Sequence, residues 1–290
     1  MKRYVPAAIA VAVLAALGIT FWLADRSGPI PSAMPSSAPA VGSCWHVAPA
    51  DIGATLPWPG NAVACTTTHN AEIFYRGQVD HSLLKQYRAA KGQAKQAATL
   101  VIDAEARSGC TGRSTAYLGG NWRGAQLTIV PVFIAPQQDG FFACVTAQVT
   151  GPGATGVVNR TAPLAGALAD GDALAIDCFA GTGSASTFTP CTEDHTGEFV
   201  GLYTVTPLGA PFNGPELQGV VTKGCQGLLN GFLGLPSAAA NRSDLQSSFV
   251  GPGSSAEWLG SDQTYACYAS SSVTMRGSIK DLGGTRPLPR

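Results

Sequence analysis

Apolar residues are concentrated near the N-terminus, where an uncharged run covers residues 5–24 between charged residues on both sides. As an α-helix rising about 1.5 Å per residue, this run would span roughly 30 Å, the thickness of the hydrocarbon core of a bilayer. A cleaved signal peptide has a shorter apolar region followed at once by a small-x-small site, whereas the nearest such tripeptide here is at residues 36–38. We therefore expect an uncleaved transmembrane anchor at residues 5–24. Lys2 and Arg3 predict, by the positive-inside rule, that residues 1–4 lie in the cytoplasm and everything after the anchor lies outside.

Segments poor in large apolar side chains divide the rest of the chain. Residues 25–40 are rich in Pro, Ser and Ala and lack periodicity, which predicts an extended linker that holds the following module away from the membrane. A second linker is predicted at residues 151–172, which begin with Gly-Pro-Gly and continue mostly with Ala, Gly and Leu. These boundaries predict one module at residues 41–150, another at 173–275, and a tail at 276–290.

Helical spacing of apolar residues occurs once in each module. In the first, Asp80 is a suitable N-cap, and apolar positions recur every three or four residues from Leu83 to Val101, so a helix is expected to end near Cys110. In the second, Pro215 suits a first helical turn. Its apolar stripe comprises Leu217, Val220 or Val221, Leu228 and Phe232.

Strand-like runs surround these helices. Expected strands lie at residues 73–75, 125–134, 141–149, 199–203 and 264–275. The fold class is therefore α+β: an N-terminal transmembrane helix followed by two similar small modules.

A short motif occurs once in each half of the chain. The pattern C-T-x-x-H-x-x-E recurs with an apolar, aromatic run directly after it, and the residues are Cys65, His69 and Glu72 in the first half and Cys191, His195 and Glu198 in the second. Because Cys and His are among the rarest residues of this chain, chance is a poor explanation. We interpret the repeat as an internal duplication.

The cysteines follow the same duplication. Each half contains four, in one order relative to the motif, and an even number outside the cytoplasm is typical of disulfides. Four cysteines allow three pairings, and sequence alone does not decide among them. The pairing we choose is Cys44 with Cys65, Cys110 with Cys144, Cys178 with Cys191, and Cys225 with Cys267.

Composition excludes one class of partner. Charged residues make up 12% of the chain, and 18 Lys and Arg balance 18 Asp and Glu, so no excess positive charge attracts phosphates. We expect no nucleic-acid binding. With 45% apolar residues the chain is still able to bury real cores.

The motif permits three interpretations. His69 with Glu72 and His195 with Glu198 could fix a turn by hydrogen bonds, which is the interpretation we favour, or could line a binding groove. Alternatively, they could bind zinc together with Cys65 or Cys191. Structural zinc usually takes closely spaced pairs such as C-x2-C, and none occurs here, so we expect neither a metal site nor a cofactor.

Catalytic signatures are missing as well. The sequence contains no G-x-S-x-G, H-E-x-x-H, P-loop or Rossmann motif, so we expect a protein that is not an enzyme. The alternatives that stay open are a hydrolase acting on the cell wall and an extracytoplasmic metal-binding protein.

At these residues the chain resembles the septum formation domain found in actinobacterial membrane proteins. The resemblance comprises G-x-C-W at residues 42–45, the C-x-x-x-H-x-x-E motif, and the cysteine after a Gly-containing turn at residues 140–144; the second half matches through Cys191, His195, Glu198, residues 258–260 and Cys267. The resemblance implies an exported, membrane-tethered module that carries no catalytic or cofactor-binding residue and is linked to division by the name of the family. We expect a binding or scaffolding protein at the envelope or division site, whose partners are division or envelope proteins or cell-wall glycan.

Overall fold

The computed structural model describes residues 30–290, except 32, 170–173, 208–209, 237–241 and 261–262. The expected anchor at residues 5–24 lies outside this range. Among the described residues, no helix has the length and apolar character needed to cross a bilayer.

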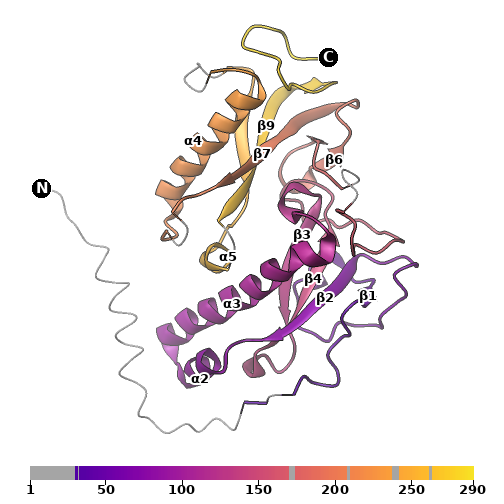
Figure 1. Cartoon of the computed structure of the whole chain (residues 1–290), viewed down its shortest axis with the longest axis vertical. Helices are drawn as coiled ribbons and strands as arrows, with labels where there is room; N and C mark the ends of the chain where they lie inside the picture. Colours follow the sequence, from indigo (N-terminus) through magenta and orange to yellow (C-terminus); the bar gives the residue numbers. More distant parts are fainter. Residues whose placement is uncertain (1–29, 32, 170–173, 208–209, 237–241, 261–262) are drawn as a thin grey trace, which may run out of the picture.

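The first unit, residues 30–169, is a four-stranded antiparallel sheet covered on one face by helices (Figure 1). Its strands are β1 (Cys44–Trp45), β2 (Ala71–Gln78), β3 (Leu127–Phe133) and β4 (Phe141–Gln148), in the spatial order β1-β2-β4-β3. Its helices are α2 (His81–Ala89) and α3 (Gly92–Leu118). Short 3-10 helices lie at η2 (Pro49–Asp51), η3 (Trp122–Gly124) and η4 (Gln137–Asp139).

The helix expected after Asp80 is divided into two. Asp80 is the N-cap of α2, because its carboxylate accepts hydrogen bonds from the N–H groups of Ser82 at 2.8 Å and Leu83 at 3.3 Å. The chain becomes extended at Ala90 and restarts as α3, which runs past the expected end to Leu118. This break resets the helical phase. The buried face therefore includes Ile102, whereas Val101, expected to be buried, is 39% exposed.

Two apolar cores lie on opposite faces of the first sheet. One is formed between α3 and the sheet by residues such as Ile102, Leu118 and Phe142. The other lies on the far face, where Leu56 and Trp58 of the segment before β2 cover the sheet. Burial on both faces explains why the pattern in β4 is almost continuously apolar.

The second unit, residues 177–290, has five antiparallel strands. They are β5 (Cys178–Ala180), β6 (Thr187–Thr189), β7 (His195–Thr204), β8 (Gln246–Val250) and β9 (Thr264–Met275), in the order β6-β5-β7-β9-β8. The helices are η5 (Gly183–Ala185), α4 (Gly214–Phe232) and α5 (Ser255–Leu259). Pro215 lies in the first turn of α4 as expected, and of the two alternatives the buried one is Val221, while Val220 is 46% exposed.

Four disulfides join these elements. They are Cys44–Cys65, Cys110–Cys144, Cys178–Cys191 and Cys225–Cys267, the same pairs as those chosen from the sequence. In each unit one bond joins the first strand to the loop before the strand that carries the motif, β2 or β7. The other bond joins the long helix to the last strand. No described cysteine is free. The helices and the two sheets confirm the mixed α+β class.

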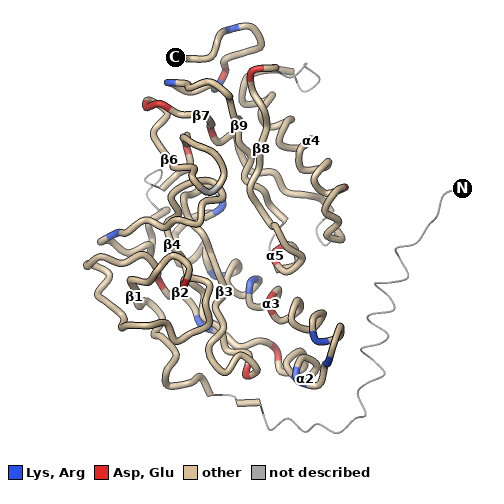
Figure 2. The backbone as a smooth tube through the Cα atoms, turned by 180° about the vertical axis from the view of Figure 1, so that it is seen from behind, with Lys and Arg blue, Asp and Glu red and all other residues tan. Residues whose placement is uncertain are grey.

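The units contact each other through α3 and α5, and through η3, which lies against β7 and β9. In Figure 1 the second sheet lies above the first, and α5 lies beside α3, where the Thr111 hydroxyl donates to the Gly260 carbonyl at 3.3 Å. Figure 2 shows Lys and Arg scattered among Asp and Glu along the described chain. This distribution agrees with the balanced charge of the sequence.

Candidate functional site

The two His–Glu motifs lie at equivalent places, at the start of β2 in the first unit and of β7 in the second. Glu72 of β2 pairs with Cys44 of β1, and Glu198 of β7 pairs with Cys178 of β5. His69, Glu72 and His195 are 0% exposed and Glu198 is 4% exposed. Burial of this degree is rare for carboxylates and requires hydrogen-bonding partners.

Glu72 is surrounded by donors from three segments. The backbone N–H of Leu164 lies 2.7 Å from Oε1 and 2.9 Å from Oε2, and the Tyr117 hydroxyl donates to Oε2 at 2.9 Å. Burial, together with the nearby Glu72 carboxylate, raises the pKa of Tyr117, so its hydroxyl keeps the proton that it donates. The carboxylate therefore connects β2, the end of α3 and the segment after β4.

His69 is held by both ring nitrogens. Nδ1 lies 2.8 Å from the Thr67 carbonyl oxygen, and Nε2 lies 3.0 Å from Oε1 of Glu72. Because a carbonyl only accepts, Nδ1 donates to Thr67, and Nε2 is hydrogen-bonded to the carboxylate. Neither nitrogen is left to act as a base toward a bound molecule.

The second motif has one difference. Glu198 accepts hydrogen bonds from the Ser278 hydroxyl at 2.5 Å and from the Ile279 N–H at 2.8 Å. His195 Nδ1 faces the Glu193 carbonyl at 2.8 Å, but Nε2 is buried without a hydrogen-bond partner among the described residues. Burial raises the pKa of the Glu198 carboxyl, and the bonds from Ser278 and Ile279 oppose this shift.

Each glutamate is closed by a segment that follows the last strand of its unit. We name residues 160–169 strap 1 and residues 276–284 strap 2. Strap 1 places the buried side chain of Leu164 in the core of the first unit, and strap 2 places that of Ile279 in the core of the second. The N–H of each of these two residues binds its glutamate.

The straps also satisfy the free carbonyls at the ends of the long helices. In strap 1 the donors come two and four residues after the buried apolar residue, and the same offsets occur in strap 2. The bonds are Gly166 N–H to Tyr117 C=O at 2.8 Å, Leu168 N–H to Leu118 C=O at 2.8 Å, Asp281 N–H to Phe232 C=O at 2.9 Å, and Gly283 N–H to Leu233 C=O at 2.8 Å. In both units one set of hydrogen bonds, which we call the lock, therefore joins the glutamate of the motif, the strap and the end of the long helix.

The straps were not predicted from the sequence. Strap 1 falls within the expected linker at 151–172 and strap 2 within the expected tail at 276–290, yet both pack against their units. A signal exists in retrospect, because an arginine after the last strand of each unit, Arg160 or Arg276, precedes Leu164 by four residues and Ile279 by three.

The geometry also tests the metal interpretation. The ligand atoms of Cys44, His69 and Glu72 lie within 4.8 Å of one another, as do those of Cys178, Cys191 and Glu198. In both groups the cysteine sulfurs are bonded in disulfides, and a thiolate is the form that binds metal. The carboxylates already accept two or more hydrogen bonds each. These donor sets fit a structural lock better than a metal centre.

The chain was also compared with known proteins. The family model described as "Septum formation" matches residues 27–267, which include both motifs and all eight cysteines. No curated protein and no solved structure matches the chain.

Proposed function

The chain belongs to the septum formation family, and on this premise we propose that it is a membrane-anchored, extracytoplasmic binding or scaffolding protein of the cell envelope. The family connects it to cell division or the envelope. The anchor at residues 5–24 and the extracytoplasmic position of the two units are parts of this proposal.

The observation that carries the proposal is the set of four disulfides. All eight cysteines are bonded, two bonds in each unit. Such bonds form and persist outside the cytoplasm and are rare within it. In the chain-entropy treatment, a disulfide closing a loop of this size stabilises the fold by about 3 to 4 kcal/mol.

We further propose that the two units arose by duplication of one module. Without β6, both sheets have the strand order first-second-fourth-third in terms of chain order. The paired cysteines, the buried glutamate and the strap bonds to the helix end recur at matching places. A duplicated module without an enzyme's reactive centre suits a role in which two similar surfaces bind or space partners.

A non-enzymatic role is supported by the environment of the histidines. Both side chains are fully buried, and those of Glu72 and Glu198 are closed by the straps. A hydrolase acting on cell-wall glycan would need such groups to reach a substrate. Burial favours the scaffolding role over that alternative.

Reporter fusions test the proposed position. Alkaline phosphatase, which is active only after export, should be active when fused after Arg290 of the full chain and inactive when residues 5–24 are deleted. A β-galactosidase fusion at the same site should show the reverse. Phosphatase inactivity with β-galactosidase activity in the full chain would place the units in the cytoplasm and refute the proposal.

Microscopy tests the link to division. A C-terminal mCherry fusion should concentrate at the septum of dividing cells, because the proposed partners are there. A fluorescence signal spread evenly over the membrane throughout the cell cycle would remove the connection with septation, and the fusion lacking residues 5–24 is the control for anchoring.

A further inference from the structure

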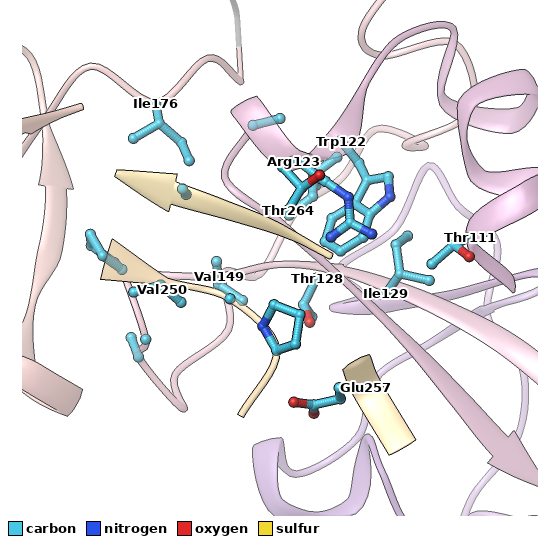
Figure 3. Close-up of a pocket in the computed structure, with 18 of the residues that line it drawn as sticks. Thr111, Trp122, Arg123, Thr128, Ile129, Val149, Ile176, Val250, Glu257 and Thr264 are labelled. Carbon is cyan, nitrogen blue, oxygen red and sulfur yellow. The ribbon is translucent and has the colours of Figure 1, made fainter. Parts of the chain in front are cut away.

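We propose that the free edge of β3 binds an extended peptide segment of a partner protein by strand addition, within a cavity between the two units. This inference rests on the proposed function as a binding protein and identifies the class of its partner. The cavity has a volume of about 260 Å³ (Figure 3). Its lining includes Leu127, Ile129 and Pro131 of β3 on one side and Thr264, Ala266 and Tyr268 of β9 on the other.

The backbone of β3 has unpaired polar groups that face away from β4. Ile134 N–H donates to Phe141 C=O, so even-numbered residues of β3 bond to β4 and odd-numbered residues face the free edge. In the described chain, Ile129 N–H and the carbonyls of Leu127, Ile129 and Pro131 have no backbone partner on that side. Pro131 lacks an N–H, and proline in a strand is typical of an edge.

Both ends of this edge are already paired. At one end the Leu56 N–H donates to Phe133 C=O at 2.9 Å, and at the other the Gln126 N–H donates to Leu174 C=O at 2.8 Å. The distance from Leu127 to Pro131 corresponds to about 13 Å of extended chain. The space therefore fits a short extended segment of three to five residues.

The unpaired backbone groups of the β3 edge are mostly carbonyls, so they favour a ligand that donates hydrogen bonds. Three carbonyls and one N–H face the gap, and in a strand added to β3 every second N–H points at one of these carbonyls. A peptide backbone supplies donors at this spacing, and side-chain contacts with the walls then determine which sequence is preferred. Unpaired edges are otherwise exposed to uncontrolled pairing, and the second unit restricts access to this one.

The walls indicate the side chains that the segment carries. Arg107, Arg123 and Glu257 are the charged residues of the lining, so positive charge is in excess by one. Figure 3 shows Arg123 against Trp122, with its guanidinium carbon 4.5 Å from the ring centroid. Nη2 of Arg107 lies 3.6 Å from Glu257, and its Nε is buried without a partner. The partner segment is therefore apolar or β-branched with one acidic group.

Selection from a random peptide library tests the proposal. The full chain, oxidised and purified in a mild detergent, is used to select from a phage-displayed library of random heptapeptides. We expect enriched peptides that combine β-branched residues with Asp or Glu and lose at least tenfold in affinity for Ala266→Trp, which fills the cavity. Thr274→Trp, an exposed position on the same strand β9, is the matched control and should bind as the wild type does.

Two further measurements identify strand addition. N-methylation of the enriched peptide should weaken binding at least tenfold at alternate residues only, and the bound peptide should slow amide hydrogen exchange of Ile129 about fivefold or more. Arg107→Met should lower the affinity for acidic peptides several-fold, whereas Arg113→Met on the same helix should leave it unchanged. The amide readout uses the unaltered protein, so it stays informative if Ala266→Trp does not fold.

Three outcomes overturn the proposal. They are enrichment of no peptide that depends on the cavity, an equal effect of N-methylation at all positions, and unchanged exchange of Ile129 when peptide is bound. None of them bears on the reporter fusions, so a failure here is distinguishable from a failure of the proposed envelope location.

Discussion

A buried carboxylate in each unit is the residue on which several segments converge. Glu72 receives bonds from His69, Tyr117 and Leu164, and Glu198 receives them from Ser278 and Ile279. Burying such a group is favourable only while its donors are in place, because each unpaired buried group has a desolvation penalty of its own. We infer that the glutamates specify how each strap docks.

Removing the first carboxylate should therefore destabilise the protein strongly. Glu72→Ala leaves His69 Nε2, the Tyr117 hydroxyl and the Leu164 N–H buried without their partner, with an expected loss of about 3 to 5 kcal/mol. The measurement is the free energy of unfolding in guanidinium chloride with disulfides intact. Glu193→Ala, at an exposed position, should change it by less than about 0.5 kcal/mol. A loss of similar size in both variants would contradict the lock.

The second carboxylate predicts a pH dependence. Burial raises the pKa of Glu198 above its ordinary value of 4.5, so the folded state holds this proton more tightly than the unfolded state. The stability that this group contributes is complete below pH 4.5 and decreases as the pH rises through the raised pKa. In Glu198→Gln this decrease should disappear.

Unfolding free energies of wild type and Glu198→Gln, measured from pH 4 to 7, should thus have different slopes at the lower end of that range. Glu193→Gln is the control and should keep the slope of the wild type. Parallel curves for all three proteins would show that Glu198 ionises alike in both states.

At the scale of elements, the straps distinguish this fold from a sheet with a loosely attached tail. In each strap, the residue whose N–H binds the first carbonyl of the helix end has a positive φ. This residue is Gly166 in strap 1, with φ of 70°, and Asp281 in strap 2, with φ of 55°. Glycine adopts this conformation without strain, and aspartate is one of the few other residues that tolerate it. The two straps thus solve the same geometric problem with different residues.

Substitution of the strap glycine tests this requirement. A Cβ at Gly166 meets no atom within 4 Å, so Gly166→Ala changes only the backbone preference and should cost about 1 kcal/mol. Gly112→Ala, also in open space but within α3, should instead stabilise by up to about 1 kcal/mol. Thermal unfolding of the two variants should shift in opposite directions; a shift in the same direction would contradict the conformational argument.

How much of this was predictable depended on the range of the interactions. The motif, the four cysteines of each half and the last strands follow from local signals such as rare residues at fixed spacing, whereas the disulfide pairing was a choice among three that the structure agrees with. The buried face of α3 was predicted wrongly because the helix breaks at Ala90, where no proline marks the break in the sequence. The straps were missed because Leu164 and Ile279 lie in segments rich in small or polar residues, and their role arises only from contact with a distant glutamate.

At the scale of the whole molecule, the second unit contains two disulfides that close loops of very different length. Cys178–Cys191 spans a sequence separation of 13 and Cys225–Cys267 one of 42. In the chain-entropy treatment the stabilisation grows with the logarithm of loop length, so the longer loop contributes about 1 kcal/mol more. It also joins α4 to β9 through two fully buried cysteines, whereas Cys191 is partly exposed.

These differences predict the result of removing each bond by a double substitution to alanine. Loss of Cys225–Cys267 should lower the free energy of unfolding by at least about 1 kcal/mol more than loss of Cys178–Cys191, since cavity formation in the core adds to the entropic effect. Mass mapping of non-reduced peptides should first establish the three remaining bonds in each variant. If the short loop proved the more important, the unfolded-state explanation would be wrong for this unit, and native packing around Cys178 would have to supply the difference.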